Sequence, residues 1–328
     1  MGIVNSPESL PIPEGATWVR FPRYIGDAVM HFPILRALRQ LGAGPLVVWG
    51  PGITVSLLRG NDMVDAILPD EGKPGPWEMA ATLRRYRAAR SIHFPKSLRP
   101  ALAAWLARVP ERIGVSESLA GPFNTHTLPF WKGQGTCLDR YMKVLALRWP
   151  DLGPAPFADF RTDVHVQVAL PDRPYVCLLP ASTPARSWGA DAYARLAEIL
   201  ADHGYLPVVQ GSPKEQDLGD LVAGTRGINA CGATLLEATA WFQGAVAVVG
   251  NNSGLSHLAA ACGTPTLSIF RAIDVEMFKP YGPKVEVVYR SEHRCGPCRL
   301  DHCRTEGHPC LSSVTPEEVW AALKVLIQ

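Results

Sequence analysis

The sequence lacks any apolar run long enough to cross a membrane. No stretch approaches the roughly 20 consecutive apolar residues that a membrane-spanning helix needs. Residues 1–15 also lack the basic start and the apolar core of a secretory signal peptide. We therefore expect a cytoplasmic protein, in which the eight cysteines should be reduced or bound to a metal.

The sequence also has little excess charge of either sign. Its 32 lysines and arginines nearly balance 30 aspartates and glutamates, which leaves a formal net charge of +2. Such a balance gives no general attraction for nucleic acid, so we expect no nucleic-acid partner. A hydrophobic content of 47% excludes a disordered chain, and 328 residues suffice for two domains of about 150 residues each.

Short β-branched and aliphatic runs alternate with longer amphipathic stretches along most of the chain. This alternation predicts an α/β fold, in which parallel sheets carry helices on both faces. The expected strands cover residues 17–21, 46–49, 66–68, 91–94, 112–115, 176–179, 206–209, 245–249 and 266–270. The expected helices cover residues 26–41, 52–59, 77–89, 97–108, 191–203, 213–223, 234–242 and 254–262. A last helix should follow Thr315, which forms a capping-box pattern with Glu318.

Prolines and glycines concentrate between residues 150 and 174, where the alternation stops. This composition predicts a linker between two doubly wound domains, an N-terminal one over residues 1–165 and a C-terminal one over residues 166–328. Ligands of such sheets bind at the carboxyl ends of the strands. We therefore expect two Rossmann-like domains that face a cleft.

Gly26 and Asp27 follow the first expected strand and open the first expected helix. Glycine permits a tight strand-to-helix turn, which leaves the carboxylate at the mouth of the sheet. Asp27 could simply cap the helix and favour its dipole, or it could act as a general base.

Two further polar segments follow strands of the second domain. The backbone N–H groups at Ser253 and Gly254 open a helix and suit a phosphate, and His257 lies one turn further along. Alternatively, these residues only cap a packed helix that contains a core histidine. The loop from Pro180 to Trp188 offers hydroxyl groups and a guanidinium for a second phosphate contact, unless it is an ordinary surface loop.

Three of these segments together resemble glycosyltransferase family 9. They are Gly26-Asp27 with Pro33 and Leu38, the loop that ends in Arg186-Ser187-Trp188, and the run Gly250-Asn251-Asn252-Ser253-Gly254-Leu255-Ser256-His257-Leu258-Ala259-Ala260-Ala261. Within that family, the second heptosyltransferase of lipopolysaccharide core synthesis is similar in Phe94-Pro95-Lys96-Ser97-Leu98-Arg99-Pro100-Ala101-Leu102, in Arg112-Ile113-Gly114 and in the tail that starts at Cys295. The likeness spans residues 17–325.

The resemblance implies a GT-B fold and an inverting glycosyl transfer that needs no metal. It implies that a heptose-like sugar moves from an ADP-sugar donor to an anionic, lipid-linked saccharide of the lipopolysaccharide inner core, with Asp27 as the base. The donor-binding positions that it implies are Gly26, Ser182, Arg186, Glu215, Asn252, Ser253, Gly254 and His257. No Asp-x-Asp motif occurs, which agrees with charge stabilisation by protein groups.

Two positions depart from the family pattern. Arg186 stands where the family usually has lysine, which preserves the charge but changes its geometry. Asn252 stands where the family usually has aspartate, so one negative charge is lost and the identity of the donor sugar is left open.

Four cysteines fall within the segment 295–310, at Cys295, Cys298, Cys303 and Cys310. Four thiolates close in sequence suit a tetrahedral zinc or iron ion of structural type. The spacing is not that of two CxxC pairs, so a disulfide or buried free thiols stay open as alternatives.

Residues 84–112 carry many basic side chains against one acid, Glu111. They could be solvated helix faces, or they could contact an anionic lipid acceptor at the inner face of the inner membrane. Two other functions also stay open, namely a nucleotide-sugar epimerase of the same architecture and a catalytically degenerate sugar-binding homologue.

Overall fold

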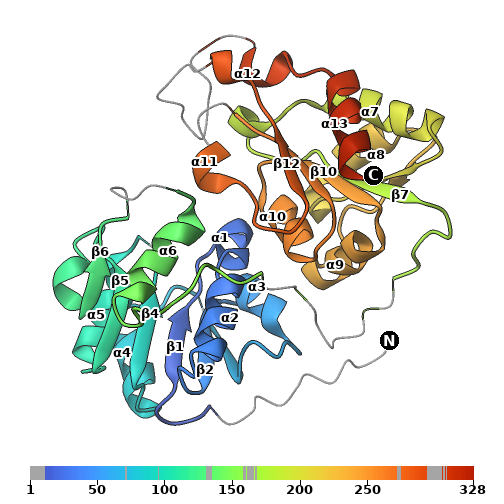
Figure 1. Cartoon of the computed structure of the whole chain (residues 1–328). Helices are drawn as coiled ribbons and strands as arrows, with labels where there is room; N and C mark the ends of the chain where they lie inside the picture. The colour runs from blue at the N-terminus through green and yellow to red at the C-terminus, as the bar shows by residue number, and fades with distance from the viewer. Residues whose placement is uncertain are drawn as a thin grey trace. The chain divides into compact units, whose positions relative to one another are not determined.

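The computed structural model describes residues 12–70, 72–94, 96–130, 135–157, 160, 166, 168–271, 275–293, 305, 307 and 309–328. The chain divides into two compact units, Met1–Val164 and His165–Gln328. Each unit is described by itself below (Figure 1). The boundary falls within the Pro- and Gly-rich stretch 150–174, in which the described residues form no strand and no helix.

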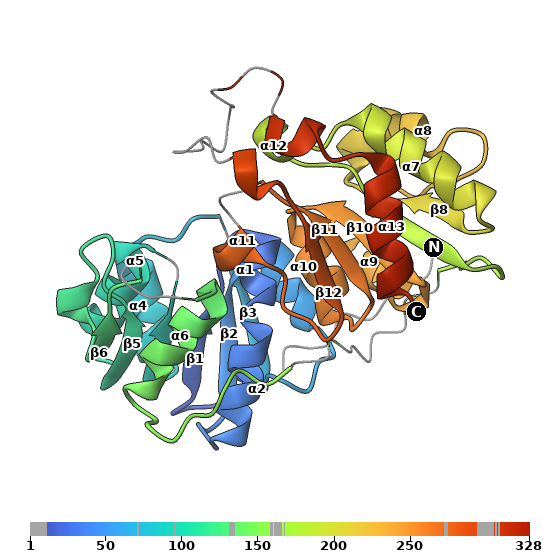
Figure 2. The ribbon, with the colours of Figure 1, turned by 45° about the horizontal axis from the view of Figure 1, so that its top comes forward.

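Unit 1 is built on a parallel sheet with the strand order β3-β2-β1-β4-β5-β6. Its strands are β1 (Thr17–Arg20), β2 (Leu46–Pro51), β3 (Ala66–Asp70), β4 (Arg90–His93), β5 (Glu111–Val115) and β6 (His126–Leu128). Its helices are α1 (Ile25–Val29), α2 (Phe32–Gln40), α3 (Gly52–Val55), α4 (Pro76–Arg85), α5 (Leu98–Leu106) and α6 (Cys137–Ala146), with 3₁₀ turns η1 (Ser56–Leu58) and η2 (Gly121–Phe123). Helices α2 and α6 cover one face of the sheet, and α4 and α5 cover the other (Figures 1 and 2).

Unit 2 repeats this topology with the strand order β12-β11-β10-β7-β8-β9. Its strands are β7 (Tyr175–Leu179), β8 (Leu206–Val209), β9 (Ile228–Asn229), β10 (Ala247–Asn251), β11 (Thr266–Ile269) and β12 (Val285–Val288). Its helices are α7 (Ala190–Asp202), α8 (Gln216–Ala223), α9 (Leu235–Gly244), α10 (Gly254–Ala261), α11 (Val275–Phe278), α12 (Pro309–Ser312) and α13 (Pro316–Leu326). The 3₁₀ turns are η3 (Pro184–Arg186), η4 (Pro213–Glu215) and η5 (Ser291–His293).

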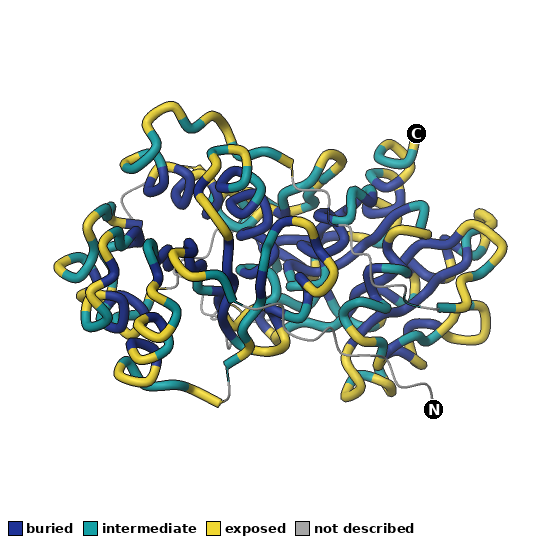
Figure 3. The backbone as a smooth tube through the Cα atoms, turned by 90° about the horizontal axis from the view of Figure 1, so that it is seen from below, coloured by how far each residue is buried: buried dark blue, intermediate teal, exposed yellow. Residues whose placement is uncertain are grey.

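Burial follows the sheets, as a parallel sheet with helices on both faces requires. The central strands β1, β2, β7, β8, β10 and β11 are buried along almost their whole length (Figure 3). In unit 1, Trp18 and Trp49 pack edge to face with ring centroids 5.6 Å apart. In unit 2, Leu196 of α7, Val222 of α8 and Leu323 of α13 pack on the same core as Val176. The predicted α/β fold is thus confirmed in both units.

Some helix boundaries differ from the sequence prediction. The single helix expected over residues 26–41 is two helices, α1 and α2, and Pro33 lies in the first turn of α2. Proline has no N–H for a helical hydrogen bond, so it starts a new helix more readily than it continues one. The capping box at Thr315 is confirmed, because the Glu318 N–H donates to its hydroxyl at 3.2 Å.

The pattern analysis also missed several elements. Strands β6, β9 and β12 have two to four residues each, too few for an alternation to stand out. Helix α6 carries both parts of a capping box, Thr136 and Asp139, and was nevertheless not assigned. The sequence pattern therefore predicts no helix or strand between residues 116 and 149.

Candidate functional site

Each sheet has one place where the strand order reverses direction. In unit 1 this switch point lies between β1 and β4, and in unit 2 it lies between β7 and β10. Segments that follow such a pair of strands diverge to opposite faces of the sheet, which leaves room for a ligand at the carboxyl edge. The predicted site residues Asp27, Arg186 and Gly254 all lie in segments that follow these strands.

Asp27 lies in the first turn of α1, directly after β1, and is partly buried together with Gly26. Its backbone carbonyl is 2.7 Å from Nδ1 of His31. Burial lowers the pKa of His31 to about 4, so the imidazole is neutral near pH 7 and Nδ1 carries the proton that it donates. The ring is also held between Phe21 and Tyr141, at centroid distances of 5.4 and 5.5 Å. These contacts fix the short helix that carries Asp27.

Lys96, in the segment after β4, supplies a positive charge close to Asp27. Its ammonium lies 4.0 Å from the centroid of the Phe130 ring. Loss of hydration lowers the pKa of Lys96, and the nearby Asp27 and Glu117 carboxylates and the Cys137 thiol, were it ionised, oppose that shift. Since burial raises the pKa of Cys137 to about 12, that thiol stays protonated near pH 7. Near pH 7, the Lys96 ammonium therefore interacts electrostatically with the carboxylates of Asp27 and Glu117.

The sequence predicts Lys96 only as part of the basic segment 84–112 and of the segment that resembles the family, without a link to Asp27. A signal was available, because Asp27 follows β1 and Lys96 follows β4. Parallel neighbouring strands end at the same edge of a sheet, so groups that follow them lie near each other. The sequence pattern does not give the strand order, so it does not predict that Asp27 and Lys96 lie near each other.

In unit 2, α10 begins immediately after β10 in a tight turn. A Cβ atom on Gly250 would lie 2.6 Å from Oγ of Ser256 and 2.9 Å from Cβ of Leu179, so only glycine fits there. The buried Ser256 hydroxyl donates to the Asn251 carbonyl at 2.6 Å. Ser253 and Gly254 are partly exposed at the start of the helix, where their N–H groups suit an anion.

Asn251 ties the loop that follows β7 to the end of β10. Its Oδ1 accepts the N–H of Trp188 at 3.0 Å, and its Nδ2 donates to the Pro180 carbonyl at 2.8 Å. Both contacts are buried, and they hold the two ends of the loop that carries Ser182 and Arg186. The sequence places Asn251 only within the run that resembles the family, whereas in the structure it joins the loop to β10.

Arg186 and His257 are neighbours within unit 2. Burial, and to a smaller extent the positive charge of Arg186, lower the pKa of His257 to about 4. Nδ1 of His257 has no hydrogen-bond partner among the described residues. The imidazole is therefore neutral near pH 7, and the positive charge available to a bound anion comes from Arg186 and from the start of α10.

The remaining predicted donor residues have separate places. Asn252 is buried, with 6% of its surface exposed. The Glu215 carboxylate accepts the Ser212 N–H at 2.5 Å and so caps η4. The neighbouring Gln210, at the end of β8, is buried, and its Nε2 has no partner in the described part of the chain. The resemblance places Gln210 at the start of the nucleotide-side loop that ends in Glu215.

The predicted metal ligands Cys295, Cys298 and Cys303 lie outside the described residues. The fourth, Cys310, is buried in α12 and packs in the core of unit 2. Within the described ranges, no group of three or more His, Cys, Asp or Glu side chains could hold a metal ion. No helix in those ranges has the length and apolar character needed to cross a membrane.

The two parallel six-stranded sheets, each with a switch point, define an α/β protein of the glycosyltransferase GT-B class. The chain matches the model of glycosyltransferase family 9 (heptosyltransferase) over residues 77–308. It therefore belongs to this family and is a glycosyltransferase.

Individual relatives support the same assignment. The chain is 24% identical to lipopolysaccharide heptosyltransferase 2 of Escherichia coli K12 over 340 aligned positions, which cover 93% of this chain and 97% of that protein. The structure of E. coli ADP-heptose LPS heptosyltransferase II superposes with a TM-score of 0.76 at 23% identity, covering 95% of this chain and 98% of that one. A family 9 glycosyltransferase of Veillonella parvula gives a TM-score of 0.79 at 18% identity, with coverage of 97% and 99%.

Proposed function

We propose that this protein transfers a heptose-type sugar from ADP-heptose to an anionic, lipid-linked saccharide of the lipopolysaccharide inner core. The observation that carries the proposal is the placement of its reactive groups. A carboxylate with a nearby ammonium follows β1 and β4, and a guanidinium with a free helix start follows β7 and β10. One structurally similar protein of E. coli is an ADP-heptose LPS heptosyltransferase, and another heptosyltransferase of E. coli has been solved with ADP-2-deoxy-2-fluoro heptose, which supports the same kind of substrates here.

In the proposed reaction, unit 1 prepares the acceptor and unit 2 holds the donor. Asp27 removes the proton of an acceptor hydroxyl, and that oxygen attacks the anomeric carbon of the heptose. The bond from that carbon to the diphosphate breaks, and ADP leaves with the electron pair. A single displacement of this kind inverts the anomeric configuration.

Charge on the departing diphosphate would be stabilised by protein groups. The N–H groups at Ser253 and Gly254, the hydroxyl of Ser182 and the guanidinium of Arg186 are the groups that we assign to it. Together with the absence of an Asp-x-Asp motif, this supports a transfer that requires no divalent metal. Glu215, Gln210 and Asn252 would contact the nucleotide or the sugar.

We further propose that the protein acts in the cytoplasm, in peripheral contact with the inner face of the inner membrane. A lipid-linked acceptor would be presented there, and basic side chains of unit 1 would meet anionic headgroups at about 1 kcal/mol each.

The decisive experiment replaces Asp27 with asparagine. A general base contributes about 10²- to 10⁴-fold to a rate, so we expect transfer to fall by at least about 100-fold. Binding of ADP, measured by calorimetry, should change by less than about threefold, because the donor groups lie in unit 2. Residual activity within about tenfold of the parent would remove Asp27 from the role of base.

Two controls accompany that measurement. Asp151→Asn alters an exposed carboxylate outside the site and should leave transfer unchanged. Incubating the donor without acceptor distinguishes the epimerase alternative, because an epimerase would alter the sugar without any acceptor present.

A further inference from the structure

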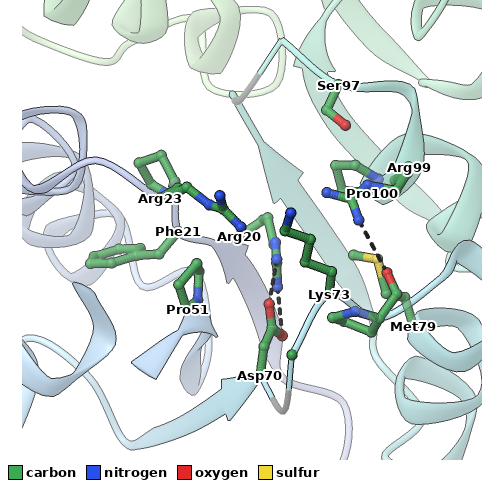
Figure 4. Close-up of a pocket in the computed structure, with 13 residues that line it drawn as sticks. Arg20, Phe21, Arg23, Pro51, Asp70, Lys73, Met79, Ser97, Arg99 and Pro100 are labelled. Atoms are coloured by element: carbon green, nitrogen blue, oxygen red, sulfur yellow. Dashed lines mark hydrogen bonds and ion pairs between the residues drawn. The ribbon is translucent and has the colours of Figure 1, made fainter. Parts of the chain in front are cut away.

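Unit 1 contains a pocket of about 150 Å³ whose walls are strongly basic. Among the described residues that line it, Arg20, Arg23, Lys73 and Arg99 are cationic and Asp70 carries a carboxylate. They come from separate segments, the end of β1, the residues that follow β3 and the start of α5, and they converge in Figure 4. Such a concentration of charge contrasts with a chain whose net charge is only +2.

One of the four cations is neutralised within the wall. Arg20 and Asp70 form a bidentate pair, with N···O distances of 2.8 and 2.5 Å, and only 11% and 7% of their side chains are exposed. The Arg20 guanidinium also lies 5.0 Å from the centroid of the Trp49 ring. This pair is a fixed, neutral wall between β1 and β3, and it leaves three positive charges for a ligand.

Those three charges are available to solvent. Arg23, Lys73 and Arg99 are exposed, and no ion pair within the described residues engages them. Arg99 donates one hydrogen bond, to the Pro74 carbonyl at 3.4 Å, which directs its guanidinium along the pocket (Figure 4). Guanidinium and ammonium groups placed together in this way are typical of an oxyanion site.

Most other arginines of the basic segment 84–112 are already engaged. Arg84 donates to the Leu106 carbonyl, Arg87 pairs with Glu14, and Arg90 pairs with Glu111. Arg112 donates to the carbonyls of Phe123 and Val109, at 2.6 and 2.5 Å. Arg99 differs from these residues because it lines a cavity.

The rest of the lining suits a sugar. Pro22, Pro51, Met79 and Pro100 offer apolar surface to a ring face, and Ser97 offers a hydroxyl. The pocket also adjoins the candidate base along the chain. Arg23 lies four residues before Asp27, and Ser97 follows Lys96.

We propose that this pocket binds one anionic sugar of the acceptor through Arg23, Lys73 and Arg99, and so selects charged acceptors over neutral ones. The proposal rests on the proposed function, since it concerns the acceptor of that transfer. The anion is an oxyanion of either a sugar acid or a sugar phosphate. The three cations orient the sugar, and Asp27 acts on the hydroxyl.

The test compares the full-length parent with the double variant Lys73→Met/Arg99→Met. Each is titrated by calorimetry, at constant ionic strength, with glucuronate, with glucose 6-phosphate and with neutral methyl glucoside. We expect the parent to bind at least one charged probe at millimolar concentration and to ignore the neutral one. The double variant should lose about tenfold or more of that affinity, because two charge-assisted contacts are removed. The charged probe that binds more tightly identifies the source of the anion.

A matched control is Arg85→Met, which removes an exposed arginine of the same basic segment outside the pocket. It should bind the charged probes like the parent. Equal binding by parent and double variant, or an equal loss in the control, would overturn the pocket. The double variant should also raise the KM for a charged lipid acceptor and leave kcat within about twofold.

The two proposals fail separately. ADP affinity and the Asp27→Asn result test the transferase, whereas probe binding in the absence of donor tests the pocket. A parent that binds neither charged probe at millimolar concentration would overturn the pocket, even if transfer is intact.

Discussion

Buried imidazoles are prominent among the polar residues near both sheet edges. His31, His93 and His257 are each at most 4% exposed, and burial lowers the pKa of each to about 4. They are therefore neutral hydrogen-bonding groups under ordinary conditions. Without a bound anion His257 is therefore neutral near pH 7, and in the proposed reaction the positive charge comes from Arg186.

These pKa values predict a loss of stability in acid. An unfolded histidine takes up a proton as the pH falls below about 6.5, whereas the folded one does so only near pH 4. The unfolded state then binds more protons, so the free energy of unfolding falls with pH across this window. Between about pH 7 and about pH 5, each buried histidine should contribute about 2 kcal/mol to that fall.

Denaturant unfolding of His257→Gln at the two pH values checks this expectation. The variant should lose about 2 kcal/mol less stability on acidification than the parent does. His126→Gln, a partly buried histidine of β6, serves as the control and should behave like the parent. An unchanged pH dependence in the His257 variant would contradict the buried, neutral state of this ring.

At the scale of elements, loops are placed by hydrogen bonds to strand ends. The loop with Ser182 and Arg186 is joined to β10 through Asn251, and the indole of Trp188 donates to the Val314 carbonyl at 2.8 Å. These contacts hold the loop against the end of β10 and against the segment that contains Val314. Its conformation depends on segments more than 60 residues away, as the separation of Trp188 from Asn251 shows.

Removing the tether should affect donor binding and stability together. In Asn251→Ala, the buried Trp188 N–H and the Pro180 carbonyl lose their partners, which should cost about 2–4 kcal/mol of stability. Because the loop is then released, ADP affinity should fall by about tenfold, measured by calorimetry on the folded variant.

Thr264→Ala provides the matched control. It removes a buried hydroxyl that donates to the Phe242 carbonyl at 2.8 Å, away from the loop. It should lower stability without changing ADP affinity. If both variants weaken ADP binding equally, Asn251 has no specific role in placing the loop.

At the scale of the whole molecule, one topology occurs twice with different chemistry at its switch points. Unit 1 presents Asp27 and Lys96 there, and unit 2 presents Arg186 and the start of α10. In the cysteine-rich segment 295–310, Cys310 packs in the core of unit 2. A metal at the four cysteines would tie residues 295–303 to that core.

Elemental analysis of the purified protein tests the metal. If the four cysteines hold a metal, the protein contains about one zinc or iron ion per chain, lost in Cys295→Ser and retained in Cys262→Ser, whereas a disulfide or buried free thiols would give none. Chelation should lower the melting temperature of the parent, because a structural ion contributes to folding. A metal-free protein with the parent's melting temperature would refute the metal site.

Much of the fold and part of the site could be predicted from the sequence, since both depend on local signals. The alternation of strands and helices and the capping box at Thr315 each involve a few adjacent residues. The tight turn expected at Gly26 is absent, because four residues separate β1 from α1 and Gly26 lies inside that helix. The same local patterns carried the resemblance to the family. They determined the fold class, the enzyme class and the candidate base.

The tertiary structure alone decided which distant residues meet. The contact of Lys96 with the surroundings of Asp27, the tether from Asn251 to Trp188 and the basic pocket all follow from strand order. Strand order is set by the packing of whole helices against a sheet, and a pattern of a few adjacent residues does not reveal it. The sequence by itself therefore identified the candidate reactive groups, whereas the residues that contact them are known only from the folded structure.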